Sequence, residues 1–277
     1  MSTSFQTKLR TNYVLRALLL PFIRLMRTAE LHKYQNSEDV QYIKELKNSC
    51  QGERCFIIGN GPSLTREDLD LLKNEKTFAA NRIYKMYPYT DWRPTYYMII
   101  DYAIIHTMNK ENEKALGAEY FFVASRKLAQ KYKNQNAHQI GKEVSVPVHP
   151  YNRVPLQKVK EDVYQCFSHP YSVTITAFEM AFYMGFKEIY LLGVDHSFAV
   201  EIDMNGKRHI NENIASHFKE DSDKGKYFSC KEALTIEYET CKKYADQHGI
   251  KVVNVTRGGK LEVFERDTLE NILQRYE

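Results

Sequence analysis

The 277-residue chain has the size and composition of a globular protein with one substantial α/β domain, since 43% of its residues are hydrophobic and 27% are charged. Its formal net charge of +4 is modest and argues against a nucleic-acid-binding surface. The five cysteines are odd in number and form no CxxC pair. They therefore argue against a zinc site or a disulfide framework and predict a reducing, cytosolic compartment.

Residues 9–28 have the pattern of a basic amphipathic helix. Arg16 and Arg24 interrupt the apolar run, which falls short of the roughly 18 uninterrupted apolar residues that a membrane-spanning helix needs. Two interpretations remain open: the helix lies in the cytoplasmic membrane interface, or it packs on the protein's own core or on a partner subunit. Pro21 weakens an ordinary core helix. We treat residues 1–36 as a segment that precedes the main domain.

The most informative motif is a strand followed by a glycine turn. Residues 55–58 are apolar and strand-like, and the turn after them contains Gly59 and Gly61, which permit backbone conformations closed to other residues. Thr65 to Asp68 has the pattern of a capped first helical turn. At the carboxyl edge of a parallel sheet, bare backbone N–H groups and the helix dipole can bind a phosphate or ribose. The pattern is neither the dinucleotide fingerprint nor the Walker motif, so it predicts a nucleotide site of unspecified kind, with an ordinary βα turn as the alternative.

Strand and helix patterns alternate along the chain, which predicts an α/β fold with a doubly wound, mostly parallel, Rossmann-like sheet covered by helices on both faces. We expect strands at 55–58, 77–80, 95–100, 119–124, 188–192 and 251–255, and helices at 37–49, 66–73, 102–116, 172–184 and 229–248. Residues 199–228 are polar, lack a clear periodicity and follow a strand, which predicts a lid. Residues 37–277 are expected to form one domain.

Several polar residues stand just past the expected strands: Asn60, Asn81, Asp101, Ser125, Asp195 and His196. The ends of parallel strands meet at one edge of a sheet, so these residues are expected to line one cleft. Singly, each is more often a turn former or a cap. The expected helix at 172 begins with the hydroxyls of Ser172 and Thr174, which could hold an anionic group at the positive end of the helix dipole while Ser172 acts as the N-cap.

The candidate general bases are His169, His196, His209 and His217. His209 and His217 fall in the expected lid, where a histidine could take a proton from an acceptor hydroxyl, although a surface histidine without a role is the alternative for each. The chain contains no H-E-x-x-H and no nucleophile elbow, and it has no tidy D-x-D motif. Hydrolase and standard metal-dependent glycosyltransferase interpretations lose their usual support, while Mg²⁺ held by Asp101 or Asp195 remains open.

Five segments resemble the MptE-like family, formerly a domain of unknown function, which occurs among bacterial surface-polysaccharide loci and in archaeal pterin biosynthesis. They are CFIIGNGPSL at 55–64, NRIY at 81–84, WRPTYYMIID at 92–101, SVTITAFEMAFYMGFKEIYLLGVDHSF at 172–198 and NVTRGGKLEVF at 254–264. Together the segments span most of the chain from residue 54 onward. Members of this family differ in function.

The same layout is similar to the glycosyltransferase family 42 sialyltransferases, which have a variant of the GT-A fold. They share the IxGNGPSL turn, and their GYKEIYLSGID-like strand matches GFKEIYLLGVD at 185–195. In those enzymes the turn and two asparagines hold a CMP-sugar, no metal is needed, and a lid histidine acts as the base. The resemblance implies the corresponding roles here: Asn60, Gly61 and Ser63 hold the nucleotide, Asn81 holds its sugar-phosphate part, and His217 is the base.

The chain also departs from that pattern. Asp101 stands where those enzymes have an asparagine, and Ser197 and Asp203 stand where they have two tyrosines that steady the leaving phosphate. Their Thr-Ser-Gly helix start is Ser-Val-Thr at residues 172–174. An enzyme without those tyrosines needs another group at the leaving phosphate, and the candidates are Arg82, Arg126, Tyr227 or a metal on the aspartates.

Taken together, these patterns predict a cytoplasmic transferase, peripheral at the inner face of the cytoplasmic membrane, that moves a sugar from a CMP-activated donor to a glycan acceptor in capsule or O-antigen synthesis without a cofactor. The alternatives are a pyrophosphokinase that transfers diphosphate from ATP with Mg²⁺, and a non-catalytic nucleotide-binding subunit of an assembly complex; a homo-oligomer fits each. The expected catalytic residues are His217, His209 and Asp195. The expected nucleotide-binding residues are Gly59, Asn60, Gly61, Pro62, Ser63, Asn81, Arg82, Asp101, Ser125, Ser172, Thr174 and Gly193.

Overall fold

The computed structural model describes residues 32–100, 117–124, 126–140, 155–164, 171–219 and 229–275, together with Pro21, Leu25, Thr28 and Ala29. The expected helix at 102–116 and most of the expected amphipathic helix at 9–28 lie outside the described residues. Among the residues that are described, no helix is both long enough and apolar enough to cross a bilayer.

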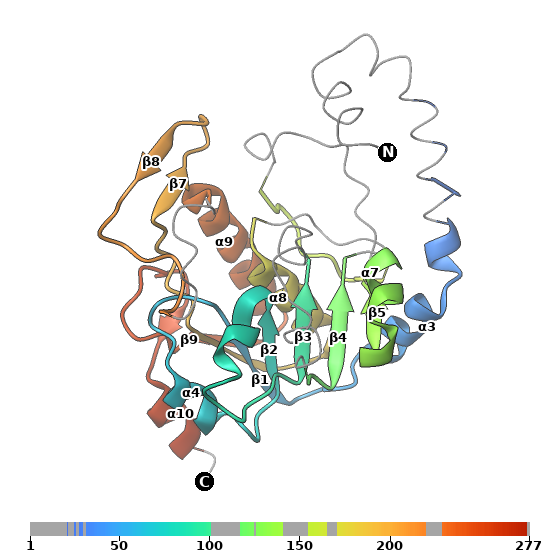
Figure 1. The fold of residues 1–277 in the computed structure, drawn as a ribbon, viewed down its shortest axis with the longest axis horizontal. Coiled ribbons are helices and arrows are strands. Elements are labelled where there is room, and N and C mark those ends of the chain that lie inside the picture. The colour runs from blue at the N-terminus through green and yellow to red at the C-terminus, as the bar shows by residue number, and fades with distance from the viewer. Residues whose placement is uncertain are drawn as a thin grey trace.

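The centre of the molecule is an eight-stranded parallel sheet with the order β10-β9-β6-β1-β2-β3-β4-β5 (Figure 1). Its strands are β1 (Arg54–Ile58), β2 (Thr77–Ala80), β3 (Tyr96–Ile99), β4 (Tyr120–Val123), β5 (Ala137–Gln139), β6 (Glu188–Leu192), β9 (Lys251–Asn254) and β10 (Glu265–Arg266). The chain lays down β1 to β5 in one direction and then returns to the other side of β1 with β6. This reversal is the topology of a doubly wound Rossmann-like sheet, so the predicted fold class is confirmed.

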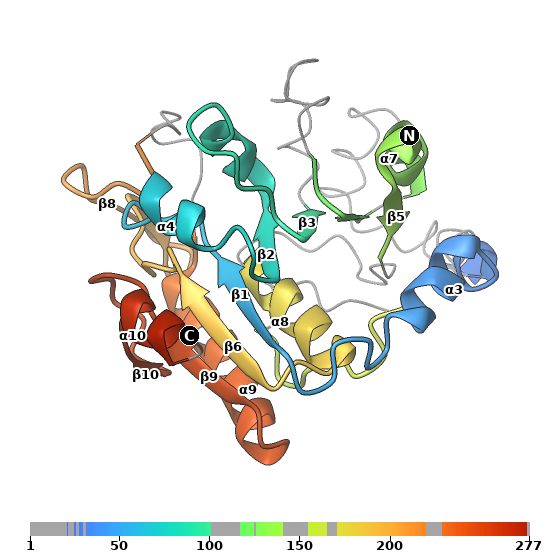
Figure 2. The same ribbon diagram turned by 90° about the horizontal axis from the view of Figure 1, so that it is seen from below.

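Helices cover both faces of this sheet, which is why its central strands are apolar runs without polar alternation. On one face lie α3 (Glu38–Glu45), α8 (Val173–Met184) and α9 (Lys231–Gln247). On the other lie α4 (Arg66–Leu71), the 3₁₀ helix η1 (Asn81–Met86), α7 (Arg126–Lys131) and α10 (Leu269–Gln274), while the 3₁₀ turn η2 (Lys133–Gln135) precedes β5. Figure 2 shows α4 and α8 on opposite sides of β1.

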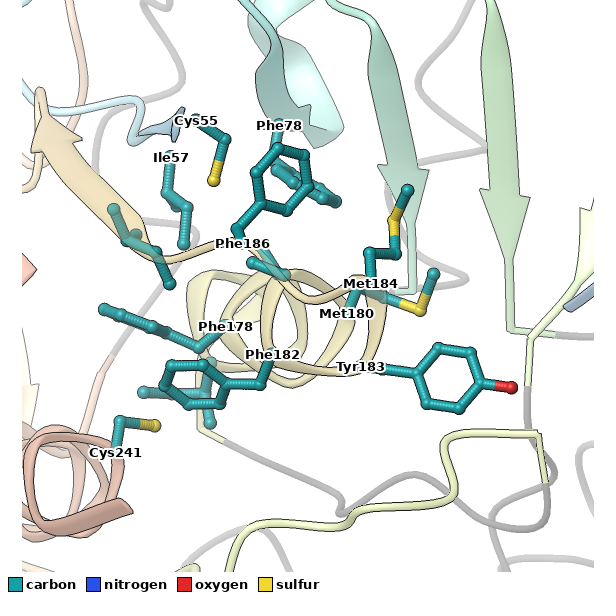
Figure 3. Packing of buried hydrophobic residues seen from close by; sticks show 14 of the residues in the cluster. Cys55, Ile57, Phe78, Phe178, Met180, Phe182, Tyr183, Met184, Phe186 and Cys241 are labelled. Carbon is teal, nitrogen blue, oxygen red and sulfur yellow. The ribbon is translucent and has the colours of Figure 1, made fainter. Parts of the chain in front are cut away.

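The α8 helix is the most deeply buried of the described helices, with all residues from 175 to 184 inside the protein. Phe178 and Phe182 pack together with ring centroids 5.6 Å apart, on the side of α8 nearest Cys241 of α9 (Figure 3). Phe186 packs edge-on against Phe78 of β2, with ring centroids 5.9 Å apart. This packing holds α8 against the sheet and brings its N-terminus to the carboxyl edge of the strands.

The expected lid contains an antiparallel hairpin, β7 (Val200–Ile202) and β8 (Arg208–Ile210), where the sequence predicted no regular structure. All three residues of β8 are exposed, so the strand has no buried face and carries no apolar alternation that would reveal it. Gly206, at a φ of +85°, allows the chain to reverse between the two strands. Backbone hydrogen bonds between Val200 or Ile202 and Ser229 join the hairpin to the residues that precede α9.

Candidate functional site

A cavity of about 140 Å³ lies where β1 and β6 end, at the point where the sheet reverses its winding. Open α/β sheets bind their ligands at this position. The lining comes from the glycine turn, the end of β2, the N-terminus of α8, the segment after β6, the lid and α9. It includes nine of the predicted site residues: Gly59, Asn60, Gly61, Asn81, Ser172, Thr174, Gly193, Asp195 and His217.

Close packing, not an unusual φ, explains the glycines of the turn. Neither Gly59 nor Gly61 has a φ in the left-handed region, which corrects the expectation from the sequence. A Cβ on Gly59 would lie 2.3 Å from the carbonyl oxygen of Gly193, and a Cβ on Gly61 would lie 1.9 Å from Oδ2 of Asp195. Larger residues would therefore push β1 and β6 apart at the cavity.

The N–H groups of these glycines are also engaged within the fold. Gly59 N donates to Leu192 O over 2.8 Å, and Gly61 N donates to Gly193 O over 2.9 Å. The prediction that the turn offers bare N–H groups is therefore wrong for both glycines. The reason is that β6 ends directly beside β1, with Ile58 paired to Leu192, so the turn continues the backbone pairing beyond the strands.

Asp195 is a buried carboxylate beneath the glycine turn, with 9% of its surface exposed. Its Oδ2 accepts a hydrogen bond from Ser63 Oγ at 2.7 Å, and its carbonyl accepts one from Lys260 N at 2.7 Å. Burial raises the pKa of the Asp195 carboxyl, although the hydrogen bonds from Ser63 act in the opposite direction. Ser63 is thus held against Asp195, and this pair connects the turn to the segment after β6.

The loop after β9 supports the site, a role that the sequence did not reveal. Asn254 is 1% exposed; its Nδ2 donates to Leu261 O over 3.0 Å, and its Oδ1 accepts from Thr256 N over 3.0 Å. Thr256 Oγ1 in turn accepts from Val194 N over 3.0 Å. Arg257 pairs with the buried Asp68 of α4. The sequence feature that marks this loop is the segment at 254–264, one of the five segments that resemble the MptE-like family.

Two asparagines present hydrogen-bond acceptors to the cavity. Asn60 Nδ2 donates to Ala80 O over 3.1 Å, and this bond orients the amide and leaves Oδ1 buried without a partner among the described residues. Asn81, the first residue of η1, has a φ of +54°, and its carbonyl accepts a hydrogen bond from the Tyr97 hydroxyl. Its Oδ1 likewise has no partner in the described part of the chain. The two predicted asparagines therefore retain hydrogen-bonding capacity for a ligand.

A hydroxyl chain lies at the N-terminus of α8 and consists of Ser172 and Thr174 together with Tyr238 of α9. Ser172 Oγ accepts from Thr174 N over 3.2 Å, which confirms Ser172 as the N-cap. Thr174 Oγ1 lies 2.8 Å from Ser172 Oγ and 2.8 Å from the Tyr238 hydroxyl. Three hydroxyl protons serve two links, so one hydroxyl of the chain retains a proton for a ligand. Burial raises the pKa of Tyr238, so this hydroxyl stays protonated at neutral pH.

His196 also lines the cavity, although the sequence gave it no firm role. The residue is 5% exposed and has a φ of +52°. Its Nε2 lies 2.8 Å from Thr235 Oγ1 on α9, and its ring packs edge-on against Tyr238 with centroids 5.7 Å apart. Burial, followed by the charge of Lys231, lowers the pKa of His196 to about 4. The ring is therefore neutral at pH 7.

The two lid histidines occupy different places. His217 lines the cavity, and the next residue, Phe218, donates its N–H to Asn60 O over 2.9 Å. Phe218 is 1% exposed within the apolar core, so the lid is anchored on the glycine turn at this point. His209 is exposed on β8, where its Nε2 lies 3.1 Å from Asp203 Oδ2, and it does not line the cavity.

The family model described as 6-hydroxymethylpterin diphosphokinase MptE-like matches residues 29–201, a span that includes the glycine turn and β6. The chain belongs to the MptE-like family. The family prediction from the sequence is confirmed, and no curated protein matches the chain.

Solved structures that match this MptE-like protein include two glycosyltransferases. The MAf glycosyltransferase from Magnetospirillum magneticum AMB-1 is 14% identical with a TM-score of 0.47, and the match covers 93% of this chain but 42% of that one. The sialyltransferase CstII from Campylobacter jejuni, determined with the substrate analogue cytidine-5'-monophosphate, is 18% identical with a TM-score of 0.45. That match covers 78% of this chain and 85% of CstII.

Some predicted residues of the MptE-like protein lie away from the cavity or outside the described residues. Pro62, Ser63 and Arg82 do not line the cavity, and Arg82 is 2% exposed within η1. Asp101 and Ser125 lie outside the described residues, as do His169 and Tyr227. Within the described ranges, no group of three or more His, Cys, Asp or Glu side chains could hold a metal ion.

Proposed function

We propose that this MptE-like protein is a glycosyltransferase that moves a sugar from a nucleotide-sugar donor to a hydroxyl of a glycan acceptor. The observation that carries the proposal is that the cavity lining combines two kinds of group. The hydroxyl chain at the positive end of α8 suits a phosphate. The unpartnered Oδ1 atoms of Asn60 and Asn81 suit the hydroxyl and amino groups of a nucleoside or sugar.

A CMP-activated donor is the specific form of this proposal. The turn at 55–64 and the segment at 185–195 resemble glycosyltransferase family 42 sialyltransferases, which use CMP-sugars. A single phosphate also matches the hydroxyl chain, which has one proton to donate beside the helix terminus.

His217 is the proposed general base. As the bond between the anomeric carbon and the phosphate oxygen breaks, the electron pair leaves with CMP, and the acceptor oxygen bonds to the anomeric carbon. His217 takes the proton of that acceptor hydroxyl. The hydroxyl chain and the positive end of the α8 dipole stabilise the leaving phosphate, in place of the two tyrosines that are Ser197 and Asp203 here. The anchoring of Phe218 on Asn60 supports this role, because it holds the neighbouring His217 at the cavity.

The biological setting is part of the same proposal. Synthesis of a surface polysaccharide at the inner face of the cytoplasmic membrane would use the basic amphipathic pattern of residues 9–28 as a peripheral contact. The donor would come from the cytoplasm, and the acceptor would be the growing glycan.

A second candidate is a diphosphokinase, which the description of the matching family favours. Such an enzyme would pass diphosphate from ATP to a hydroxymethyl group with Mg²⁺. Among the described residues that line the cavity, Asp195 is the carboxylate, and its Oδ2 already accepts from Ser63. These residues do not by themselves fit a magnesium ion, which needs several oxygen ligands.

A thermal-shift panel of CMP, CDP, UDP, GDP, ADP and ATP, each with and without Mg²⁺, separates the candidates. A ligand at about 100 times its Kd stabilises the native state by about 2.7 kcal/mol. For a chain of this length that corresponds to a rise in Tm of about 5 °C. Stabilisation by CMP or CDP without metal supports the glycosyltransferase, whereas stabilisation by ATP only with Mg²⁺ supports the diphosphokinase. No stabilisation by any nucleotide would contradict both proposals.

A further inference from the structure

His196 adopts a backbone conformation that the surrounding fold must enforce. Its φ of +52° lies in the left-handed region, which non-glycine residues seldom occupy and which costs free energy. The preceding carbonyl, of Asp195, is held by Lys260 N at 2.7 Å, and a Cβ on Gly259 would lie 3.2 Å from that same carbonyl oxygen. Residues in such conformations cluster at ligand sites. The fold therefore places this imidazole at the cavity at a cost in free energy.

The hydrogen bonds of Thr235 define which nitrogen of His196 carries the proton. Thr235 Oγ1 donates to Lys231 O over 3.0 Å, since a carbonyl oxygen only accepts. The single hydroxyl proton is then used, so Oγ1 must accept from His196 Nε2–H over 2.8 Å for both bonds to form. In the neutral ring, Nδ1 is consequently the nitrogen with the free lone pair.

This lone pair is left without a partner. Nδ1 is buried and makes no hydrogen bond with any described residue, and a buried polar atom in this state costs about 1–3 kcal/mol. Because the pKa of His196 is lowered, Nδ1 does not take up a proton at pH 7, and its lone pair stays unpartnered. Asn60 Oδ1 and Asn81 Oδ1, in the same cavity lining, are acceptors in the same condition. Three orphaned acceptors lining one cavity call for a ligand that brings donors.

We propose that His196 Nδ1 accepts a hydrogen bond from a hydroxyl or amino group of the nucleotide in the cavity, and that Thr235 positions the ring by fixing its tautomer. The inference rests on the proposed function for the presence of a nucleotide and adds a residue that recognises it. Phosphate oxygens at neutral pH are acceptors, so they are disfavoured beside Nδ1. The phosphate therefore faces the hydroxyl chain of α8, and the donor groups of the nucleoside face His196.

Isothermal titration calorimetry with CMP tests the contact on the full-length protein and two variants. In His196→Asn, the amide oxygen stands near the place of Nδ1 and keeps an acceptor, and asparagine tolerates a left-handed φ. In His196→Gln, the amide nitrogen reaches the place of Nε2 and can donate to Thr235, but no acceptor remains near Nδ1. We expect His196→Gln to weaken CMP binding about tenfold and His196→Asn to stay within about threefold of the wild type.

Three analogues identify the group that His196 contacts: 2'-deoxy-CMP and 3'-deoxy-CMP each lack one ribose hydroxyl, and UMP lacks the base amino group. One of these analogues should bind the wild type about tenfold more weakly than CMP. His196→Gln should bind that analogue and CMP with nearly equal affinity. Equal CMP affinity in His196→Gln and the wild type would overturn the inference. Equal losses in both variants would also overturn it, because the acceptor would not be what matters.

The remaining outcomes separate this inference from the proposed function. If CMP binds but none of these measurements depends on His196, the inference fails and the proposed function stands. If the wild type binds no nucleotide, both fail. A ¹⁵N NMR measurement on the wild type requires no substitution: CMP should move the Nδ1 resonance of His196 upfield as it accepts a hydrogen bond. An unchanged resonance at saturating CMP would overturn the inference even if both variants failed to fold.

Discussion

The pKa of His196 predicts how the stability of the protein depends on pH. An unfolded histidine has a pKa of about 6.5, whereas burial and Lys231 lower the native value to about 4. Between these two values the unfolded chain binds a proton that the native state does not. The contribution to stability is therefore present above pH 6.5 and is lost as the pH falls towards 4, at about 1.4 kcal/mol per pH unit. By pH 4 the loss amounts to about 3 kcal/mol.

Urea unfolding of the wild type and of His196→Asn between pH 7 and pH 4 measures this contribution. The variant has no imidazole, so we expect its free energy of unfolding to fall by about 3 kcal/mol less than that of the wild type over this range. Asp195 acts in the opposite direction, because the raised pKa of its carboxyl stabilises the native state as the pH falls. That term is present in both proteins and cancels in the difference. Parallel curves for the two proteins would refute the reasoning.

Three further predictions concern the turn, the hydroxyl chain and the lid. In thermal unfolding, Gly61→Ala should destabilise the protein by about 2–4 kcal/mol, because the added Cβ overlaps the carboxylate of Asp195 beneath the turn. The control Gly206→Ala, whose added Cβ meets nothing within 4 Å, should cost about 1 kcal/mol in the same assay. Tyr238→Phe should weaken CMP binding about threefold to tenfold without affecting cytidine, which lacks the phosphate; an equal loss for both ligands would contradict its role beside the phosphate. His217→Ala should lower sugar transfer by about 100-fold or more with CMP affinity unchanged, whereas His209→Ala should retain turnover; full activity in His217→Ala would exclude it as the base.

The elements with strong local signals were predictable from the sequence. The apolar runs that became β1, β2 and β6 need no alternation because both faces of the sheet are covered, and their expected positions agree with the structure. Helix starts with capping residues were also predictable, since Thr65 and Asp68 form a capping box at the start of α4. The short edge strands β5 and β10 and the hairpin β7–β8 were not predicted, because strands of two or three residues are too short to show a periodic pattern.

The site was predictable as a convergence of residues, but not in its detailed chemistry. Strand-end positions predicted that Asn60, Asn81 and Asp195 would meet, and all three line one cavity. The role of Tyr238 could not be predicted, because its hydroxyl reaches the cavity from α9, about sixty residues after Thr174. Nor could the sequence distinguish His217 from His209, since only the backbone contact between Phe218 and Asn60 shows which one lies at the cavity.

The sequence by itself determined the alternation of strands and helices and the glycine turn after β1, because these depend on local preferences and on apolar patterns that repeat within a few residues. Tertiary structure decided why the glycines are needed, which polar atoms are left for a ligand, and the pKa values of His196 and Asp195. Each of these depends on what an atom contacts from a distant part of the chain: Gly59 on Gly193, and His196 on Thr235. Packing and desolvation are set by such contacts, and they arise only when the sheet is assembled.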